Sequence, residues 1–173
     1  MNREEWLQTV KKNLVWVELG VFLGDFSKKI YELSNPLELH LVDTFPDVMV
    51  SGDKDGNNVI QADLSKAPND LEKYFVNKNV KIHKMMSFEF LENLPDSSID
   101  VVYIDADHSY NSVKKDLELS MRKVRKSGLI TGHDYCPTSF PGVYRAVNEF
   151  CNSNSLKIDF LTDDKLPTYV ISL

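Results

Sequence analysis

Short apolar runs separated by amphipathic stretches dominate the pattern of this 173-residue chain. Runs of five or six apolar residues are typical of strands buried on both faces of a parallel sheet, because neither face of such a strand meets water. The predicted strands, in chain order, are Leu14–Leu19, Leu37–Val42, Val80–Met85, Ile99–Ile104, Leu129–Gly132, Leu156–Leu161 and Thr168–Leu173.

Amphipathic segments lie between these runs, with apolar residues at the three- and four-residue spacing of a helix. Ser109 is a good N-cap for one of them, and Pro141 stands where the last one begins. The predicted helices are residues 2–12, Phe26–Leu33, Leu64–Val76, Phe88–Leu94, Tyr110–Val124 and the segment from Pro141 to Cys151.

The connections complete the predicted architecture. Thr44–Asp63 is rich in Pro, Gly, Asp and Asn and predicts a loop, either the wall of a binding site or a surface excursion. Basic residues ahead of Gly128 predict that a helix ends there with a glycine cap. Thr162–Pro167 is too short for a crossover helix, so the last two strands must be antiparallel. We expect a single domain over residues 1–173 with a doubly wound, Rossmann-like α/β fold, whose seven-stranded, mostly parallel sheet ends in a C-terminal antiparallel hairpin.

The charge of the chain narrows the class of ligand. The sequence has 20 basic and 26 acidic residues and a formal net charge of −6, whereas a nucleic-acid binder normally carries a basic face. No apolar segment approaches the roughly 20 residues that span a bilayer, and the polar first ten residues are not a secretion signal. We expect a cytoplasmic protein with reduced cysteines that acts on a small molecule, without nucleic-acid or membrane partners. Homo-oligomerisation is left open.

The turn after the first strand carries the first candidate chemistry. Gly20 and Gly24 allow the backbone to approach a ligand, and the helix that follows presents free amide groups. The spacing Glu-x-Gly-x-x-x-Gly differs from the Gly-x-Gly-x-x-Gly of dinucleotide sites, and Glu18 would repel a diphosphate but suit an ammonium group. Asp43 ends the second strand, where an acidic side chain can bind ribose hydroxyls.

Acidic and imidazole side chains follow two later strands. Asp105, Asp107 and His108 come directly after the fourth strand, and His133 and Asp134 come directly after the fifth. Ligands of open α/β sheets bind just beyond the carboxyl ends of the strands, so these groups are placed for chemistry. Asp107 is expected to serve the turn and no more.

Four segments together resemble the class I S-adenosylmethionine-dependent methyltransferases: Val17–Gly24, Leu41–Asp43, Ile99–Tyr110 and Gly128–Tyr135. More narrowly, Asp-Ala-Asp-His-Ser-Tyr, followed by Gly-His-Asp-Tyr and Pro-Gly-Val-x-x-Ala-Val, resembles a small-molecule branch. That branch includes relatives of the macrocin O-methyltransferase and of the cephalosporin-biosynthesis methyltransferase. The resemblance covers nearly the whole chain and implies the same sheet topology.

The resemblance implies a set of S-adenosylmethionine contacts. Gly20 would face the methionine part of the cofactor, and Asp43 would bind the ribose. Ser87 and Phe88 would flank the adenine; the family often has an acidic residue there, whereas Ser87 is neutral. The full set of implied cofactor contacts is Glu18, Gly20, Gly24, Asp43, Thr44, Ser87, Phe88 and Asp105.

The resemblance also implies how a hydroxyl acceptor would be activated, since a hydroxyl must lose its proton as it attacks. Metal-dependent O-methyltransferases of this superfamily carry acids at the positions of Asp105 and Asp134, which implies Mg²⁺ or Mn²⁺ held by this pair. Related enzymes carry a Lys or His base at the position of His108. His133 is a second candidate base, or a softer metal ligand. The family has a further acid or amide beside the second metal ligand, where this chain has His133 and Tyr135.

We therefore expect a methyltransferase that transfers a methyl group from S-adenosylmethionine to a hydroxyl of a small molecule, such as a sugar or a natural product. Val48–Asn58 and Cys136–Phe140 are expected to frame this acceptor. Two alternatives are a nicotinamide-dependent Rossmann oxidoreductase, which Glu18 and the glycine spacing disfavour, and a cofactor-binding module without turnover.

Overall fold

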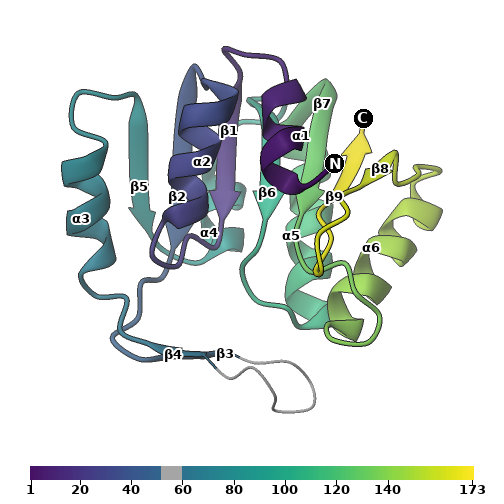
Figure 1. The fold of residues 1–173 in the computed structure, drawn as a ribbon. Helices are drawn as coiled ribbons and strands as arrows, with labels where there is room; N and C mark the ends of the chain where they lie inside the picture. Colours follow the sequence, from purple (N-terminus) through teal and green to yellow (C-terminus); the bar gives the residue numbers. More distant parts are fainter. Residues whose placement is uncertain (52–59) are drawn as a thin grey trace.

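The computed structural model describes residues 1–51 and 60–173, and Figure 1 shows the path of the chain. The helices are α1 (Arg3–Thr9), α2 (Asp25–Ser34), α3 (Ala67–Tyr74), α4 (Ser87–Asn93), α5 (Tyr110–Lys123) and α6 (Pro141–Ser153). The strands are β1 (Val15–Leu19), β2 (Glu38–Asp43), β3 (Met49–Ser51), β4 (Ile60–Ala62), β5 (Val80–Lys84), β6 (Ile99–Ile104), β7 (Val124–Gly132), β8 (Phe160–Leu161) and β9 (Tyr169–Ser172). Within these ranges, no helix combines the length and the apolar composition that a bilayer crossing requires.

The order of the strands confirms the predicted fold. Seven strands form one sheet in the order β5-β2-β1-β6-β7-β9-β8. The strands from β5 to β7 run parallel, and β9 is antiparallel to both β7 and β8. The hairpin follows from the short connection between the last two strands, although β8 keeps only the final two residues of the predicted Leu156–Leu161. The strand order reverses between β1 and β6, and ligands bind at such a switch point.

Alternating side chains along the buried strands build an apolar layer on each face of the sheet. Trp16 belongs to the layer that α1, α2 and α3 cover, and Val17 belongs to the layer that α4, α5 and α6 cover. Both side chains are fully buried. Successive residues of a strand point to opposite faces, so an unbroken apolar run supplies both layers at once.

Two predictions of local structure are wrong. The segment Thr44–Asp63 contains the antiparallel pair β3 and β4 instead of a continuous loop. Each of these strands carries a β-branched residue, which favours extended structure. Residues 52–59, which include most of the predicted acceptor loop Val48–Asn58, lie outside the described residues.

The second error concerns the end of α5. This helix ends at Lys123 without a glycine cap, and Gly128 lies inside β7. Val124 is buried and pairs with Ile99, so the chain enters the sheet five residues earlier than predicted. Gly128 is required there because a Cβ atom would lie 2.6 Å from the carbonyl oxygen of Asp100.

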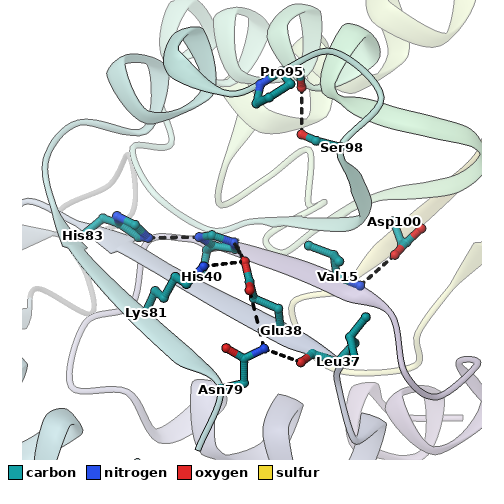
Figure 2. A network of polar contacts seen from close by, with 10 residues as sticks. All are labelled: Val15, Leu37, Glu38, His40, Asn79, Lys81, His83, Pro95, Ser98 and Asp100. Atoms are coloured by element: carbon teal, nitrogen blue, oxygen red, sulfur yellow. Dashed lines mark hydrogen bonds and ion pairs between the residues drawn. The ribbon is translucent and has the colours of Figure 1, made fainter.

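Figure 2 shows a polar network that joins β2 and β5. His40 Nδ1 lies 3.0 Å from His83 Nε2, and His40 Nε2 lies 2.6 Å from Glu38 Oε1. Lys81 Nζ lies 2.9 Å from the same carboxylate oxygen. The two ring nitrogens of His40 face partners on opposite sides, so the network cannot converge on one metal ion. The rings of these two histidines contact each other within the sheet.

Candidate active site

A cavity of about 1120 Å³ opens at the carboxyl ends of β1, β2, β5 and β6. Drug-sized ligands occupy pockets of about 300–1,000 Å³, so the cavity has room for a large ligand and a small partner. It contains most of the predicted cofactor contacts. Those that line it are Glu18, Gly20, Asp43, Thr44, Ser87, Phe88 and Asp105, together with His108.

Gly20 is required at the β1–α2 turn by a close approach of two backbone segments. Its φ is +89°, and a Cβ atom there would lie 2.0 Å from the carbonyl oxygen of Asp105 and 2.7 Å from Ala106 Cα. No L side chain fits at that distance. The glycine therefore brings the turn after β1 into contact with the turn after β6, in addition to facing the cavity.

Asp43 fastens the same turn to β2. One carboxylate oxygen accepts hydrogen bonds from the amides of Val21 (2.8 Å) and Phe22 (3.0 Å), and the other accepts from the amide of Phe45 (2.9 Å). The side chain also lines the cavity. It thus fixes the backbone around the place where the ribose is expected.

Glu18 and Arg3 are two ionisable residues of the cavity wall near the β1–α2 turn. Glu18 is buried, accepts a hydrogen bond from the Ser27 hydroxyl, and its burial raises the pKa to about 8. The Arg3 guanidinium comes from α1, lies 4.3 Å from the ring centre of Phe26 and lines the cavity. This part of the wall thus combines the buried carboxyl group of Glu18 with the permanent positive charge of Arg3.

Asp105, His108, His133 and Asp134 form an acid–imidazole cluster at the other end of the cavity. His108 Nε2 lies 2.8 Å from Asp134 Oδ2 and 3.6 Å from Asp105 Oδ1. His133 Nδ1 lies 3.1 Å from Asp134 Oδ1 and 3.9 Å from Asp105 Oδ2. Carboxylates and imidazoles therefore alternate around one point, and each acid faces both histidines.

The backbone ladder of the sheet continues past the strand ends and positions this cluster. The amide of Asp105 donates to the carbonyl of Leu19 (2.7 Å), and the amide of His133 donates to the carbonyl of Ile104 (3.0 Å). Asp134 then turns out of the strand with φ +59°, a left-handed angle that non-glycine residues seldom adopt. This turn swings its carboxylate between the two histidines.

Burial and opposite charge compete in the cluster. Burial alone would lower the pKa of His108, but the contacts with Asp105 and Asp134 outweigh it and raise the pKa to about 10. Burial would also lower the pKa of His133, but the contact with Asp134 and the charge of Asp105 outweigh it, so this pKa is raised as well. The two imidazoles hold the pKa of Asp134 well below its usual range despite its burial. The two carboxylates therefore favour the protonated form of both imidazoles when no cation is bound.

The donor set of the cluster fits a divalent cation. Asp105, His108 and Asp134 each offer one ligand atom, and these atoms lie within 4.8 Å of one another. His108 Nε2 is buried, and its contacts with the two acids lack the alignment of a hydrogen bond. Two carboxylates suit Mg²⁺, and an imidazole as a third ligand suits Mn²⁺ or Zn²⁺. His108 can therefore act either as a base beside such a cation or as its third ligand.

Some predicted site residues lie outside the cavity wall. Gly24 starts α2, and a Cβ atom there would lie 2.3 Å from Leu71 Cδ2, so packing against α3 explains this glycine. His133 and Asp134 lie behind the wall, where Asp134 contacts His108. Asp107, by contrast, does line the cavity, and it also serves its turn, because it accepts a hydrogen bond from the amide of Ser109 (2.6 Å).

Sequence patterns missed several residues of the cavity, among them Arg3 and Asp116. Arg3 and Asp116 come from the helices α1 and α5, and Phe140 precedes α6. The centres of the Phe140 and His108 rings lie 4.6 Å apart, so Phe140 covers the imidazole. Phe140 itself belongs to the segment Cys136–Phe140, which was expected to frame an acceptor.

The sheet order and the cavity at its switch point are the arrangement expected of a class I S-adenosylmethionine-dependent methyltransferase. A family model described as "Methyltransferase domain" matches residues 17–135, and the chain belongs to that family. The match covers the β1–α2 turn, Asp43 and the whole acid–imidazole cluster. It decides against the nicotinamide-dependent alternative.

Solved structures share this fold at low sequence identity. The protein SMU.1697c of Streptococcus mutans, solved in complex with S-adenosylhomocysteine (SAH), is 11% identical with a TM-score of 0.65, over 98% of this chain and 95% of that one. Precorrin-6y C5,15-methyltransferase of Geobacter metallireducens GS-15 is 16% identical with a TM-score of 0.67, over 98% and 83%. The N-methyltransferase NodS of Bradyrhizobium japonicum WM9 is 9% identical with a TM-score of 0.64, over 98% and 93%. A search of curated proteins finds no match. The likeness shows the fold and does not select an acceptor.

Proposed function

We propose that this protein transfers the methyl group of S-adenosylmethionine to a hydroxyl group of a small molecule, with the help of a divalent cation. The observation that carries the proposal is the junction of the large cavity with the acid–imidazole cluster. Asp105 and His108 line the cavity, and Asp134 lies 2.8 Å from His108 Nε2. Transfer from a sulfonium to a hydroxyl needs a positioned acceptor that loses its proton, and this junction offers groups for both tasks.

The cofactor half of the proposal rests on complementary charge. The methionine part of the cofactor carries an ammonium and a carboxylate group. Glu18 faces the ammonium group, and Arg3 faces the carboxylate at the same end of the cavity. Asp43 receives the ribose, and Ser87 and Phe88 receive the adenine.

The acceptor half rests on the cluster. Asp105 and Asp134 would hold the cation, and His133 orients Asp134 from behind. Without a cation the two acids keep His108 protonated, whereas a cation bound by them would displace that proton and leave the imidazole free to take the proton of the hydroxyl. A bound divalent cation lowers the pKa of a hydroxyl at the site. Phe140 packs on His108 and shields the reacting end from water. The net charge of −6 supports a small-molecule acceptor over a nucleic acid.

We expect SAH to bind the wild-type protein at submillimolar concentration in isothermal titration calorimetry. Arg3→Ala removes the positive charge that would bind the carboxylate of the ligand's amino-acid part. We expect SAH binding to weaken by about tenfold to a hundredfold, which is the usual contribution of a hydrogen bond to a charged group. Arg122→Ala, at the far end of α5, is the matched control and leaves binding unchanged. Absence of SAH binding to the wild type would contradict the cofactor assignment.

Methyl transfer can be followed by mass spectrometry with a panel of sugars and phenols and matched amines as acceptors. We expect EDTA to abolish methylation of the hydroxyl compounds and Mg²⁺ or Mn²⁺ to restore it. His108→Ala slows turnover by about 10²–10⁴-fold, the range of a general base, and leaves metal affinity unchanged.

His83→Ala, a histidine of the β2–β5 network, is the control and retains activity. Loss of metal binding in His108→Ala would make this residue a ligand and not the base. Full activity in EDTA would remove the metal from the proposal, and methylation of the amines alone would contradict the hydroxyl acceptor. SAH binding without transfer to any acceptor would favour a module without turnover.

A further inference from the structure

A second buried acid lines the cavity and does not belong to the acid–imidazole cluster. Asp116 lies on α5, and only 2% of the residue is exposed. Its side chain nevertheless reaches the cavity wall. No step of the proposed methyl transfer uses this carboxylate.

The hydrogen bonding of Asp116 is incomplete. The Ser87 hydroxyl donates to Asp116 Oδ1 at 2.8 Å, and among the described residues no other group donates to this carboxylate. The neighbouring Lys115 pairs with Glu92 instead, at 3.3 Å. A buried carboxylate with a single hydroxyl partner is costly, because lost hydration is not replaced. Burial accordingly raises the pKa of Asp116 to about 6.

The neighbours of Asp116 place it at one defined end of the cavity. Ser87 and Phe88 begin α4, directly after β5, and the Lys115 ammonium group lies 3.5 Å from the ring centre of Phe88. In the sheet, β5 lies beside β2, which ends at Asp43. A nucleoside whose ribose lies at Asp43 therefore extends its base toward Ser87, Phe88 and Asp116.

We propose that Asp116 accepts a hydrogen bond from the exocyclic amino group of the adenine and makes the site selective for a 6-amino purine. This inference rests on the proposed function, since it assumes that S-adenosylmethionine occupies the cavity. It explains the neutral Ser87, because α5 supplies the acid that is missing after β5. The amino group supplies the donor that the buried carboxylate lacks, whereas a 6-oxo purine presents an oxygen and repels it.

The test compares three ligands by calorimetry: SAH, its 6-oxo analogue S-inosylhomocysteine, and its N6,N6-dimethyl analogue. The wild type binds SAH at least about tenfold more tightly than either analogue, because neither analogue has an N–H donor at this position. Asp116→Asn weakens SAH binding and removes or reverses the preference over the 6-oxo analogue, since an amide can donate to that oxygen. Glu118→Gln, an exposed acid on the same helix, leaves the preference unchanged.

The outcomes separate the two proposals. A wild-type protein that binds no ligand overturns the proposed function and this inference together. If the wild type binds SAH and both analogues equally well, only the role of Asp116 is overturned, and this result needs no variant to fold. Equal weakening of SAH and the 6-oxo analogue in Asp116→Asn would likewise reduce Asp116 to a structural residue.

Discussion

A single backbone angle decides how the acid–imidazole cluster closes. Asp134 has φ +59°, and its carboxylate reaches both His108 and His133. The amide of Tyr135 donates to the carbonyl of Pro167, which holds the turn after β7 against the last connection. A residue in a sparsely populated backbone region costs about 1–3 kcal/mol and persists where the surroundings hold it. The sequence predicted that the two acids meet, but the angle that turns Asp134 toward the histidines depends on contacts with a distant segment.

The burial of Glu18 predicts how stability changes with pH in the ligand-free protein. Its pKa is raised from 4.5 to about 8, so the folded state keeps a proton that the unfolded state has lost. The resulting stabilisation is complete below pH 4.5 and is lost as the pH rises toward 8. Urea unfolding should show a decrease of roughly 3 kcal/mol between pH 5 and pH 8 from this group.

Glu18→Gln is neutral at both pH values and nearly the same size, so it should remove most of this decrease. Glu32→Gln, which changes an acid on the exposed side of α2, should keep it. An unchanged pH dependence in Glu18→Gln would show that Glu18 is ionised in the folded protein.

At the scale of elements, the β1–α2 turn is the most constrained part of the fold. A methyl group at Gly20 would lie 2.0 Å from the carbonyl oxygen of Asp105, and the φ of +89° disfavours any side chain. We expect Gly20→Ala to lower the free energy of unfolding by at least about 2 kcal/mol, and the melting temperature by roughly 4 °C or more. SAH binding should be lost as well, since the turn must move.

Asn35→Gly provides the matched control, because Asn35 ends α2 with φ +47° and needs no room from a neighbour. This variant should keep its melting temperature or gain slightly, since glycine adopts the left-handed region freely. A Gly20→Ala protein as stable as the wild type would contradict the close approach of the two turns.

The elements also show why sequence reasoning found one part of the site and missed another. Asp43 and Asp105 follow strong apolar runs, and the end of a parallel strand is a place that a pattern can predict. Arg3 and Asp116 reach the cavity from helices, where nothing in the local spacing distinguishes them from other charged residues. The entry of Val124 into β7 was missed for a related reason, because its partner Ile99 is remote in sequence.

At the scale of the whole molecule, the doubly wound fold and its C-terminal hairpin could be predicted because few topologies satisfy the alternation of strands and helices and the short connections. The rest of the sheet topology was implied by the family resemblance. The pairing of β3 and β4 could not be predicted, since strands of three residues carry too little pattern. The cavity volume and its lining depend on how several helices pack against the sheet, and no single segment of the sequence predicts that arrangement. The sequence therefore predicted the edge of the sheet at which the site lies more fully than it predicted the wall around it.

The hydrogen-bond ladder that continues past β1 and β6 has a consequence for how such a protein can diversify. Asp105 is tied to Leu19, and His133 to Ile104, by the same backbone bonds that build the sheet. The groups that would align donor and acceptor thus belong to the rigid frame, whereas Phe140 and Met49 lie outside the seven-stranded sheet, before α6 and in the short strand β3. A change in those segments can retarget the site to a new acceptor without disturbing the alignment of the methyl group, so new specificity can arise here in few steps.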